Sequence, residues 1–122
     1  MSQPILVVED NDDLSILFKL VLESAGYQVT TVNNGRDALE SLAKTDPQLI
    51  LMDVMMPEIS GLQVSQSIKQ QQSYESLPIL LVSALDRLRD EQLQDSQAND
   101  ILYKPFDLDD LIHKVDELIA AA

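Results

Sequence analysis

Three acidic side chains stand at the ends of short apolar runs, where the chain changes from apolar to polar residues. Glu9 and Asp10 follow the run at 4–8, and Asp53 ends the run that begins at 48. Carboxylates that lie close together repel one another and raise one another's pKa unless a cation intervenes. An oxygen-rich site with few ligands suits Mg²⁺, which keeps several waters and often binds beside phosphate oxygens.

Two other polar residues end apolar runs farther along the chain. Ser83 follows the run at 77–82, and Lys104 follows the run at 100–103. A lysine supplies a point charge for phosphate, and a serine supplies a hydroxyl donor. A lone carboxylate near a metal ion, a lysine and a hydroxyl is equipped to accept a phosphoryl group. Asp53 by itself could equally cap a turn or the next helix, so the functional interpretation depends on the fold.

The apolar runs are predicted to be β-strands. Residues 4–8, 48–53 and 77–82 are almost continuously apolar, which is typical of strands buried on both faces of a parallel sheet. Residues 28–32 alternate between apolar and polar side chains, which indicates a strand near a sheet edge. Residues 100–103 predict a short fifth strand.

Segments of helical periodicity separate the strands. The clearest is 108–119, where apolar residues recur at helical spacing and Asp107 is predicted to cap the helix. Asn11 or Asp12 is predicted to cap the first helix, and two more helices follow the second and third strands. Residues 85–96 are mostly polar, so they predict a weak fourth helix.

Five strands alternating with five helices across short loops predict an α/β fold, with a parallel sheet covered on both faces. Residues 1–122 are expected to form one domain, because the sequence shows no linker, repeat or second core. In open α/β folds, ligands bind at the carboxyl ends of the strands. The polar residues at four of these ends are therefore predicted to converge.

Composition excludes several classes of protein. The formal net charge is −13, from 21 acidic and 8 basic residues, and the basic residues are scattered. Such a field repels polyanions, so direct binding of nucleic acid is not expected. No apolar run approaches the roughly 20 residues that span a bilayer, and the first residues do not resemble a signal peptide. The absence of cysteine excludes disulfides and thiolate metal sites. A cytoplasmic location is expected.

The ordered set of motifs resembles the receiver domain of two-component response regulators. The motifs are Ile5-Leu6-Val7-Val8-Glu9-Asp10, Asp53-Val54-Met55-Met56-Pro57 with Gly61, Ser83-Ala84 and Lys104-Pro105-Phe106. Each motif is weak alone, but their order is specific and covers essentially the whole chain. The resemblance implies a doubly wound, flavodoxin-like receiver fold with strand order 2-1-3-4-5.

The resemblance also implies a role for each matching acidic residue. Asp53 corresponds to the aspartate that takes a phosphoryl group from the histidine of a partner kinase. Glu9 and Asp10 correspond to the acidic pair that holds Mg²⁺ together with Asp53. Met55 stands where the family uses a backbone carbonyl as a further metal ligand, which leaves its side chain free to vary.

The matching residues after the fourth and fifth strands are expected to report phosphorylation. Ser83 corresponds to the switch hydroxyl and Lys104 to the lysine that pairs with the phosphoryl group. The peptide bond to Pro105 is expected to be cis. The family often has an aromatic switch residue where this chain has Ile101, and an isoleucine is too short and too stiff to swing in the same way. Tyr103 is expected to face away from Lys104 and is no obvious substitute.

Other positions also depart from the family or leave a role open. The Gly-Ala pair common before the fifth strand is Gln97-Ala98 in this chain. Met55 and Leu85 are expected to flank the site with apolar side chains, which could slow the attack of water on a phosphoryl group. Glu58 could reach a metal-bound water, although a solvated loop position is the simpler interpretation.

The function implied is a phosphorylation-driven switch in a phosphorelay, and not turnover of outside substrates. The expected partners are a sensor histidine kinase or a histidine phosphotransfer protein, and a downstream output protein or domain. The surface expected to change comprises the fourth helix, the fifth strand and the fifth helix. A phosphorylation-dependent dimer is compatible with this interpretation, and membrane association is not expected.

Three alternatives are open at this point. A phosphatase with an aspartate nucleophile usually carries a second acid two residues after the first, where this chain has Met55. Flavodoxin-like cofactor binding would require a Ser/Thr-rich loop after the first strand, where this chain has Glu9-Asp10-Asn11. A receiver that serves only as a docking module is the third alternative, but every key residue for phosphorylation is intact.

Overall fold

The continuous apolar segments form the centre of a five-stranded parallel sheet, as predicted. The structure, a computed structural model, describes residues 3–84 and 90–122. The strands are β1 (Ile5–Val8), β2 (Val29–Val32), β3 (Leu49–Asp53), β4 (Ile79–Ser83) and β5 (Asp100–Tyr103). Their order is β2-β1-β3-β4-β5 and all four pairings are parallel. The predicted fold class and strand order are therefore confirmed.

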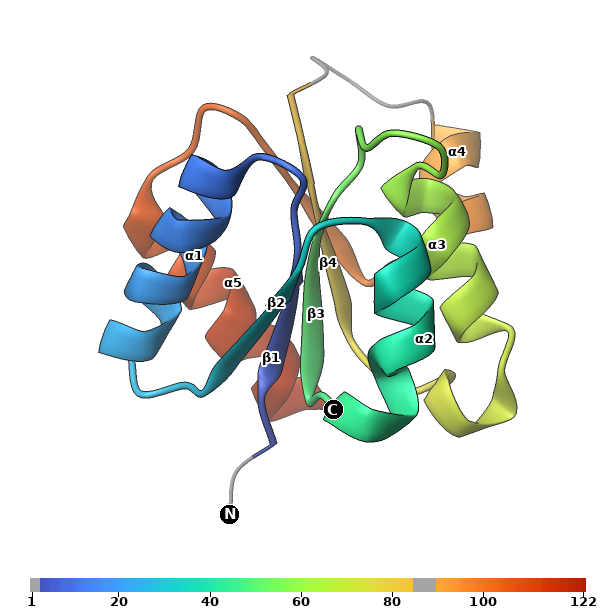
Figure 1. The fold of residues 1–122 in the computed structure, drawn as a ribbon, viewed down its shortest axis with the longest axis horizontal. Helices are drawn as coiled ribbons and strands as arrows, with labels where there is room; N and C mark the ends of the chain where they lie inside the picture. Colours follow the sequence, from blue (N-terminus) through green and yellow to red (C-terminus); the bar gives the residue numbers. More distant parts are fainter. Residues whose placement is uncertain (1–2, 85–89) are drawn as a thin grey trace.

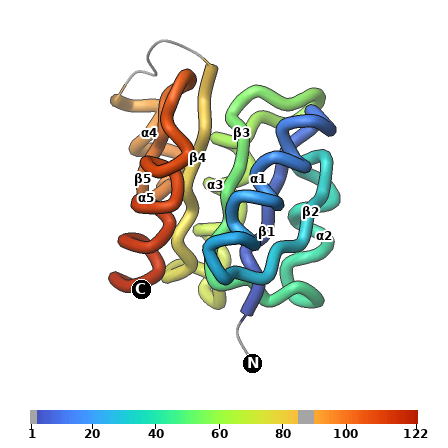
Figure 2. Tube along the Cα trace, turned by 90° about the vertical axis from the view of Figure 1, so that its left-hand side faces the viewer, coloured from blue at the N-terminus to red at the C-terminus, as the bar shows by residue number. Residues whose placement is uncertain are grey.

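Five helices of the described residues cover the two faces of the sheet. They are α1 (Asp12–Ser24), α2 (Gly35–Thr45), α3 (Gly61–Lys69), α4 (Asp90–Ser96) and α5 (Leu108–Ala121), with a short 3₁₀ turn at Gln72–Tyr74. Helices α1 and α5 lie side by side on one face, and α2, α3 and α4 lie on the other (Figure 1, Figure 2). The fourth helix was expected over 85–96, of which 85–89 lie outside the described residues.

Side chains before the helices satisfy backbone groups that the first turn leaves free. The Asn11 side chain accepts a hydrogen bond from the Leu14 N–H at 2.9 Å and so caps α1. Ser60 and Gln63 form a reciprocal capping box at α3. Asp107 occupies the capping position of α5, but its side chain accepts no hydrogen bond from the helix, so the predicted cap is wrong in this respect. Its negative charge still interacts favourably with the positive amino end of the helix dipole.

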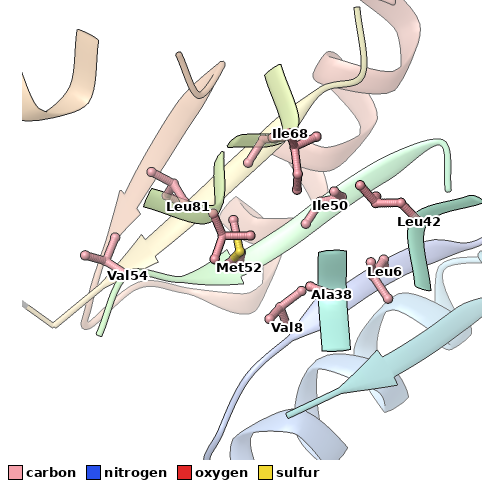
Figure 3. Close-up of a cluster of buried hydrophobic side chains, with 11 residues drawn as sticks. Leu6, Val8, Ala38, Leu42, Ile50, Met52, Val54, Ile68 and Leu81 are labelled. Atoms are coloured by element: carbon pink, nitrogen blue, oxygen red, sulfur yellow. The ribbon is translucent and has the colours of Figure 1, made fainter. Parts of the chain in front are cut away.

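Two apolar clusters pack against the sheet, one on each face. Figure 3 shows the cluster on the α2–α3 face, where strand side chains meet helix side chains. Its fully buried members include Leu6, Val8, Ile50, Met52, Ile68 and Leu81. On the other face, Phe18 of α1 stacks on Phe106 with ring centroids 6.4 Å apart. Each fully buried side chain of this size contributes about 1.5–3 kcal/mol to the stability of the fold. The two clusters therefore hold the strands in place, and with them the sheet edge that carries the polar residues.

The two edge strands differ from the buried centre. In β2, which lies at the sheet edge as predicted, Thr30 and Thr31 are both exposed, so burial along this strand does not alternate. The carboxyl ends of the strands lie together at the top of Figure 1, and α5 ends at the opposite edge. Within the described ranges, every helix is too short or too polar to cross a membrane.

Candidate functional site

The parallel register places the acidic strand ends next to one another. Val8 pairs with Met52, so Glu9 follows β1 directly beside Asp53 at the end of β3. Glu9, Asp10 and Asp53 each offer a carboxylate oxygen within 4.8 Å of the others. Glu9 is 1% exposed and Asp53 is 6% exposed, whereas Asp10 is open to solvent. The structure thus brings together the three predicted metal ligands that act through side chains.

Asp53 has a partner on each carboxylate oxygen. The Lys104 ammonium lies 3.3 Å from Oδ2, and the Met55 backbone N–H donates to Oδ1 at 3.0 Å. Lys104 reaches this position because β5 runs beside β4, with the Lys104 N–H donating to the Ser83 carbonyl at 2.8 Å. The lysine side chain is 28% exposed, so its charge is only partly screened by solvent.

Glu9 is less completely satisfied than Asp53. Its Oε2 accepts a hydrogen bond from the Asn11 N–H at 3.1 Å. Its Oε1 is buried without a hydrogen-bond partner among the described residues. Burial raises the pKa of Glu9 to about 8; the Asn11 N–H opposes this shift and the Asp53 carboxylate adds to it. A buried acceptor without a partner costs about 1–3 kcal/mol, which a bound cation would offset.

The predicted switch residues lie at the end of β4, within β5 and directly after Lys104. Ser83 is fully buried as the last residue of β4, one residue after Val82, which pairs with Asp53. The Lys104–Pro105 peptide bond is cis, as the resemblance implies. Ile101 is half-buried and packs on the α2–α3 face of the core.

The loop from β3 to α3 folds back on the Asp53 backbone. The Gly61 N–H donates to the Val54 carbonyl at 2.8 Å. A Cβ at Gly61 would lie 2.2 Å from the Asp53 carbonyl oxygen, so this approach requires glycine. The sequence indicated Gly61 only as part of a motif, because the close contact depends on where the loop returns.

The structure also shows a contact that the sequence did not predict. Arg36 Nη2 of α2 lies 3.7 Å from Glu58 Oε2 in the β3–α3 loop. Glu58 has a left-handed backbone, with φ 69°, and its carboxylate is not part of the acidic cluster. The two residues are distant in sequence and exposed, so no local pattern marks the pair.

Three remaining positions complete the comparison with the sequence. The Met55 side chain is 55% exposed at the rim of the site. Leu85, the other expected apolar neighbour, lies outside the described residues. Tyr103 is half-buried and packs on the same core cluster as Ile101.

Comparison with known proteins agrees with this geometry. Residues 5–116 match the family described as the response regulator receiver domain. A receiver domain of a signal transduction histidine kinase from Syntrophus aciditrophicus superposes with a TM-score of 0.92 and 34% identity, over 99% of this chain and 92% of that one. The response regulator TrrA from Thermotoga maritima, solved with Mg²⁺ and BeF, gives a TM-score of 0.87 and 32% identity, over 96% and 99% of the two chains.

The first curated relatives are longer than this chain. The transcriptional regulatory protein YkoG of Bacillus subtilis is 36% identical over 91% of this chain and 48% of its own length. The chain thus spans about half the length of the first curated relatives that it matches. These matches show that the chain belongs to the receiver domains of two-component response regulators, a signalling family and not an enzyme family that turns over outside substrates.

Proposed function

We propose that this chain is a phosphorelay receiver of 122 residues that takes a phosphoryl group onto Asp53. The donor is a phosphohistidine of a sensor histidine kinase or of a histidine phosphotransfer protein. The observation that carries the proposal is the environment of Asp53: a buried carboxylate beside two other acids, with the Lys104 ammonium 3.3 Å from one oxygen. This arrangement presents a nucleophile and a cation to one incoming group.

The donor set fits Mg²⁺. Glu9, Asp10 and Asp53 supply oxygens within 4.8 Å of one another, and the buried Oε1 of Glu9 has no hydrogen-bond partner in the part of the chain that the structure describes. These side chains, with the backbone carbonyl of Met55, are the groups that would hold the ion. When bound, Mg²⁺ neutralises the charge that develops during in-line phosphoryl transfer.

The transfer step needs few protein groups. An oxygen of Asp53 forms a bond to phosphorus while the bond from phosphorus to the donor histidine breaks, and the imidazole leaves with the electron pair. The Lys104 ammonium compensates the charge of the transferred group, and the Ser83 hydroxyl donates to it. Self-phosphorylation and the later loss of the phosphoryl group are the only chemistry in this proposal.

Phosphorylation then acts on the surface formed by α4, β5 and α5. Ser83 ends β4 and Lys104 follows β5, so both residues lead directly into that surface. Shifting a two-state equilibrium from 1:99 to 99:1 requires about 5.5 kcal/mol. Hydrogen bonds to a charged group contribute about 1.5–3 kcal/mol each, so two or three of them suffice.

Ile101 is proposed to weaken the coupling between Ser83 and this surface, because an isoleucine cannot swing as the family's aromatic residue does. It lies on the core cluster that also contacts Leu93 of α4 and Tyr103. We expect backbone movement around β5 and at 84–90, of which 85–89 lie outside the described residues, with little rotation at Ile101. Methyl NMR with and without beryllium fluoride measures this directly, and a large rotamer exchange at Ile101 over a still backbone would contradict it.

Two other functions have less support. Met55 stands where a phosphatase of the aspartate-nucleophile class would carry its second acid, and its backbone N–H already binds Asp53. A receiver used only for docking has no need of a buried acid cluster with a lysine beside it. A phosphorylation-dependent dimer and an output partner remain part of the proposal.

The proposal is tested by phosphorylation with acetyl phosphate and Mg²⁺. Intact-mass measurement should show one added phosphoryl group on the wild-type chain and none on Asp53→Asn. The matched control is Asp109→Asn, which removes the same charge from the exposed first turn of α5. Undiminished labelling of Asp53→Asn would show that another residue accepts the group.

A further inference from the structure

The two edges of the sheet differ in charge. At one edge, β5 begins with Asp100, whose carboxylate pairs with the Lys114 ammonium at 2.6 Å, and α4 and α5 beside it each carry two acids in the first turn. At the other edge lies β2, within a stretch from 24 to 35 that has neither a charged residue nor a proline. Figure 2 shows β2 on the side of the sheet away from β4 and β5. Proteins usually protect an open strand edge with charges or proline, and β2 has neither.

The main chain of β2 has groups that face away from the sheet. The Ile5 N–H donates to the Gln28 carbonyl at 2.8 Å, and β2 pairs with β1 alone. Because main-chain groups alternate in direction along a strand, even-numbered residues face β1, and Val29 and Thr31 face outward. Among the described residues, no strand lies beside these outward groups.

The side chains of β2 also leave the edge open. Thr30 and Thr31 point to opposite faces of the sheet, because successive side chains alternate along a strand. Both are exposed, although α1 contacts β2 on one face and α2 contacts it on the other. The two helices therefore cover the inner part of the strand and leave its outer side accessible.

A second copy of this chain fits the open edge better than it fits the β5 edge. The formal net charge of −13 makes two copies repel one another, and a contact between uncharged surfaces adds least to this repulsion. The acids nearest to β2 are Asp12 and Asp37, which line a hollow with Thr31 toward the carboxyl end of the strand. Parallel pairing of two β2 strands would bring these acids together, whereas antiparallel pairing keeps them at opposite ends.

We propose that β2 is a self-association edge, through which two copies pair antiparallel about a two-fold axis at Thr30. Val29 of each copy pairs with Thr31 of the other through main-chain hydrogen bonds, and the two sheets become continuous. Thr30 then faces Thr30 of the second copy, which is a favourable pair across strands. Because β1 separates β2 from β3, this contact leaves the acidic site open and does not depend on the proposed function.

Sedimentation equilibrium of the wild-type chain tests the proposal. A contact through a four-residue strand is smaller than a standard interface, so we expect a dissociation constant on the order of 100 µM. Raising the salt from about 0.02 M to about 0.5 M should strengthen the dimer about fivefold, because it screens the repulsion between the two copies. Mg²⁺ with beryllium fluoride should leave the dissociation constant unchanged.

A charge placed on the two-fold axis should weaken the dimer. Thr30→Lys puts two ammonium groups opposite one another and should raise the dissociation constant about tenfold. The matched control is Gln94→Lys, which adds the same charge at an exposed position of α4 and should leave the dimer intact. Both variants lower the net negative charge, so a difference between them reports the place of the contact.

Thr31→Pro tests the main-chain pairing. It removes an outward N–H and should abolish the dimer, while the outward position keeps the ladder to β1 and the far-ultraviolet circular dichroism unchanged.

A cysteine at the axis tests the register, because the chain has no cysteine of its own. Directly opposed residues of a non-hydrogen-bonded pair have Cα atoms about 4.5 Å apart, which a disulfide can bridge. Thr30→Cys should therefore cross-link two copies in oxidised glutathione. Thr31→Cys, whose counterpart in the second copy lies farther along the strand, should cross-link at least about tenfold more slowly.

Each outcome supports or overturns the assignment. A wild-type chain that stays monomeric at about 1 mM overturns it, as does a dimer that forms only with beryllium fluoride. A dimer that Thr30→Lys leaves as strong as Gln94→Lys does, or that salt weakens, would lie on another surface. Equal cross-linking of the two cysteine variants would contradict the antiparallel register about Thr30.

Discussion

The two halves of the acidic site differ in how their negative charge is compensated. At the end of β3, Asp53 has the Lys104 ammonium on one oxygen and the Met55 N–H on the other. At the end of β1, Glu9 has the Asn11 N–H on one oxygen and no partner among the described residues on the other. The protein alone therefore compensates the half at β3, whereas the half at β1 is neutralised either by a proton, as the raised pKa of Glu9 indicates, or by a cation. This difference supports the proposal that the buried cluster of three acids holds Mg²⁺.

Removing Lys104 should have the largest effect, because it leaves the carboxylate at the end of β3 as poorly compensated as the one at the end of β1. Lys104→Met is expected to slow labelling by acetyl phosphate about 100-fold, since a positioned charge is lost from the transferred group. Because the lysine is partly exposed, the unfolding free energy should fall by only about 1 kcal/mol.

Lys114→Met is the matched control for that variant. Lys114 forms an ion pair with Asp100 at 2.6 Å between α5 and β5, away from the acidic cluster. This variant should label at the wild-type rate. Equal slowing of the two variants would show that Lys104 acts through general charge and not through Asp53.

Neutralising Glu9 should have the next largest effect. It should raise the unfolding free energy, whereas removal of Lys104 should lower it. Without Mg²⁺ at neutral pH, Glu9→Gln should raise the unfolding free energy by about 1–2 kcal/mol, because it removes a buried carboxyl group that must take up a proton on folding. Urea unfolding in the presence of a chelator measures this change. Glu40→Gln, on the exposed face of α2, should stay within about 0.5 kcal/mol of wild type. A destabilised Glu9→Gln would mean that the β1 half is already compensated.

Magnesium should compensate the β1 half in the wild-type chain. At a concentration ten times its dissociation constant, the ion should add about 1.4 kcal/mol to the unfolding free energy by mass action. Glu9→Gln should gain much less at the same concentration, because it has lost one ligand. Thermal unfolding with and without Mg²⁺ gives both values. An unfolding temperature that Mg²⁺ leaves unchanged in the wild type would argue against the site.

The pH dependence of the metal-free chain should report the same group. The pKa of Glu9 rises from 4.5 to about 8 on folding, so between these values the folded state binds more protons than the unfolded state. The contribution of Glu9 to stability should therefore fall as pH increases across this window. The difference in stability between wild type and Glu9→Gln should widen from about pH 5 to pH 8. A constant difference would contradict the raised pKa.

The smallest expected effect is at a position outside the acidic site, and it serves as a control for changes in stability that do not involve the site. Gln97, at the end of α4, has a left-handed backbone with φ 60°, where the family commonly has glycine. Gln97→Gly should raise the unfolding free energy by about 1 kcal/mol, because an L-residue is strained in this conformation. The gain should be the same with and without Mg²⁺, and a magnesium-dependent gain would show coupling to the site.

Much of the site could be predicted because its signals are local. The apolar run before Asp53 marked a central strand, and β3 ends at that residue. Parallel pairing then placed Glu9, Asp53 and Lys104 at one edge without further information. The edge position of β2 likewise followed from its alternating residues.

The features that escaped prediction depend on distances between segments. The ion pair of Arg36 with Glu58 forms because the start of α2 meets the β3–α3 loop, and the need for glycine at 61 arises from the return of that loop to Asp53. The unequal compensation of Asp53 and Glu9 is also invisible in sequence, since both are acids at strand ends. Asp107 shows the converse, because a suitable residue at a capping position made no side-chain cap.

The location of the phosphoryl group tests the central claim most directly. After reaction with acetyl phosphate and Mg²⁺, borohydride reduction converts an aspartyl phosphate to homoserine, and peptide sequencing by mass spectrometry locates it. Homoserine should appear at position 53 in the wild-type chain and should be absent from Asp53→Asn. Homoserine at position 10, or an equal yield in Asp53→Asn, would contradict the assignment of Asp53 as the phosphoryl acceptor.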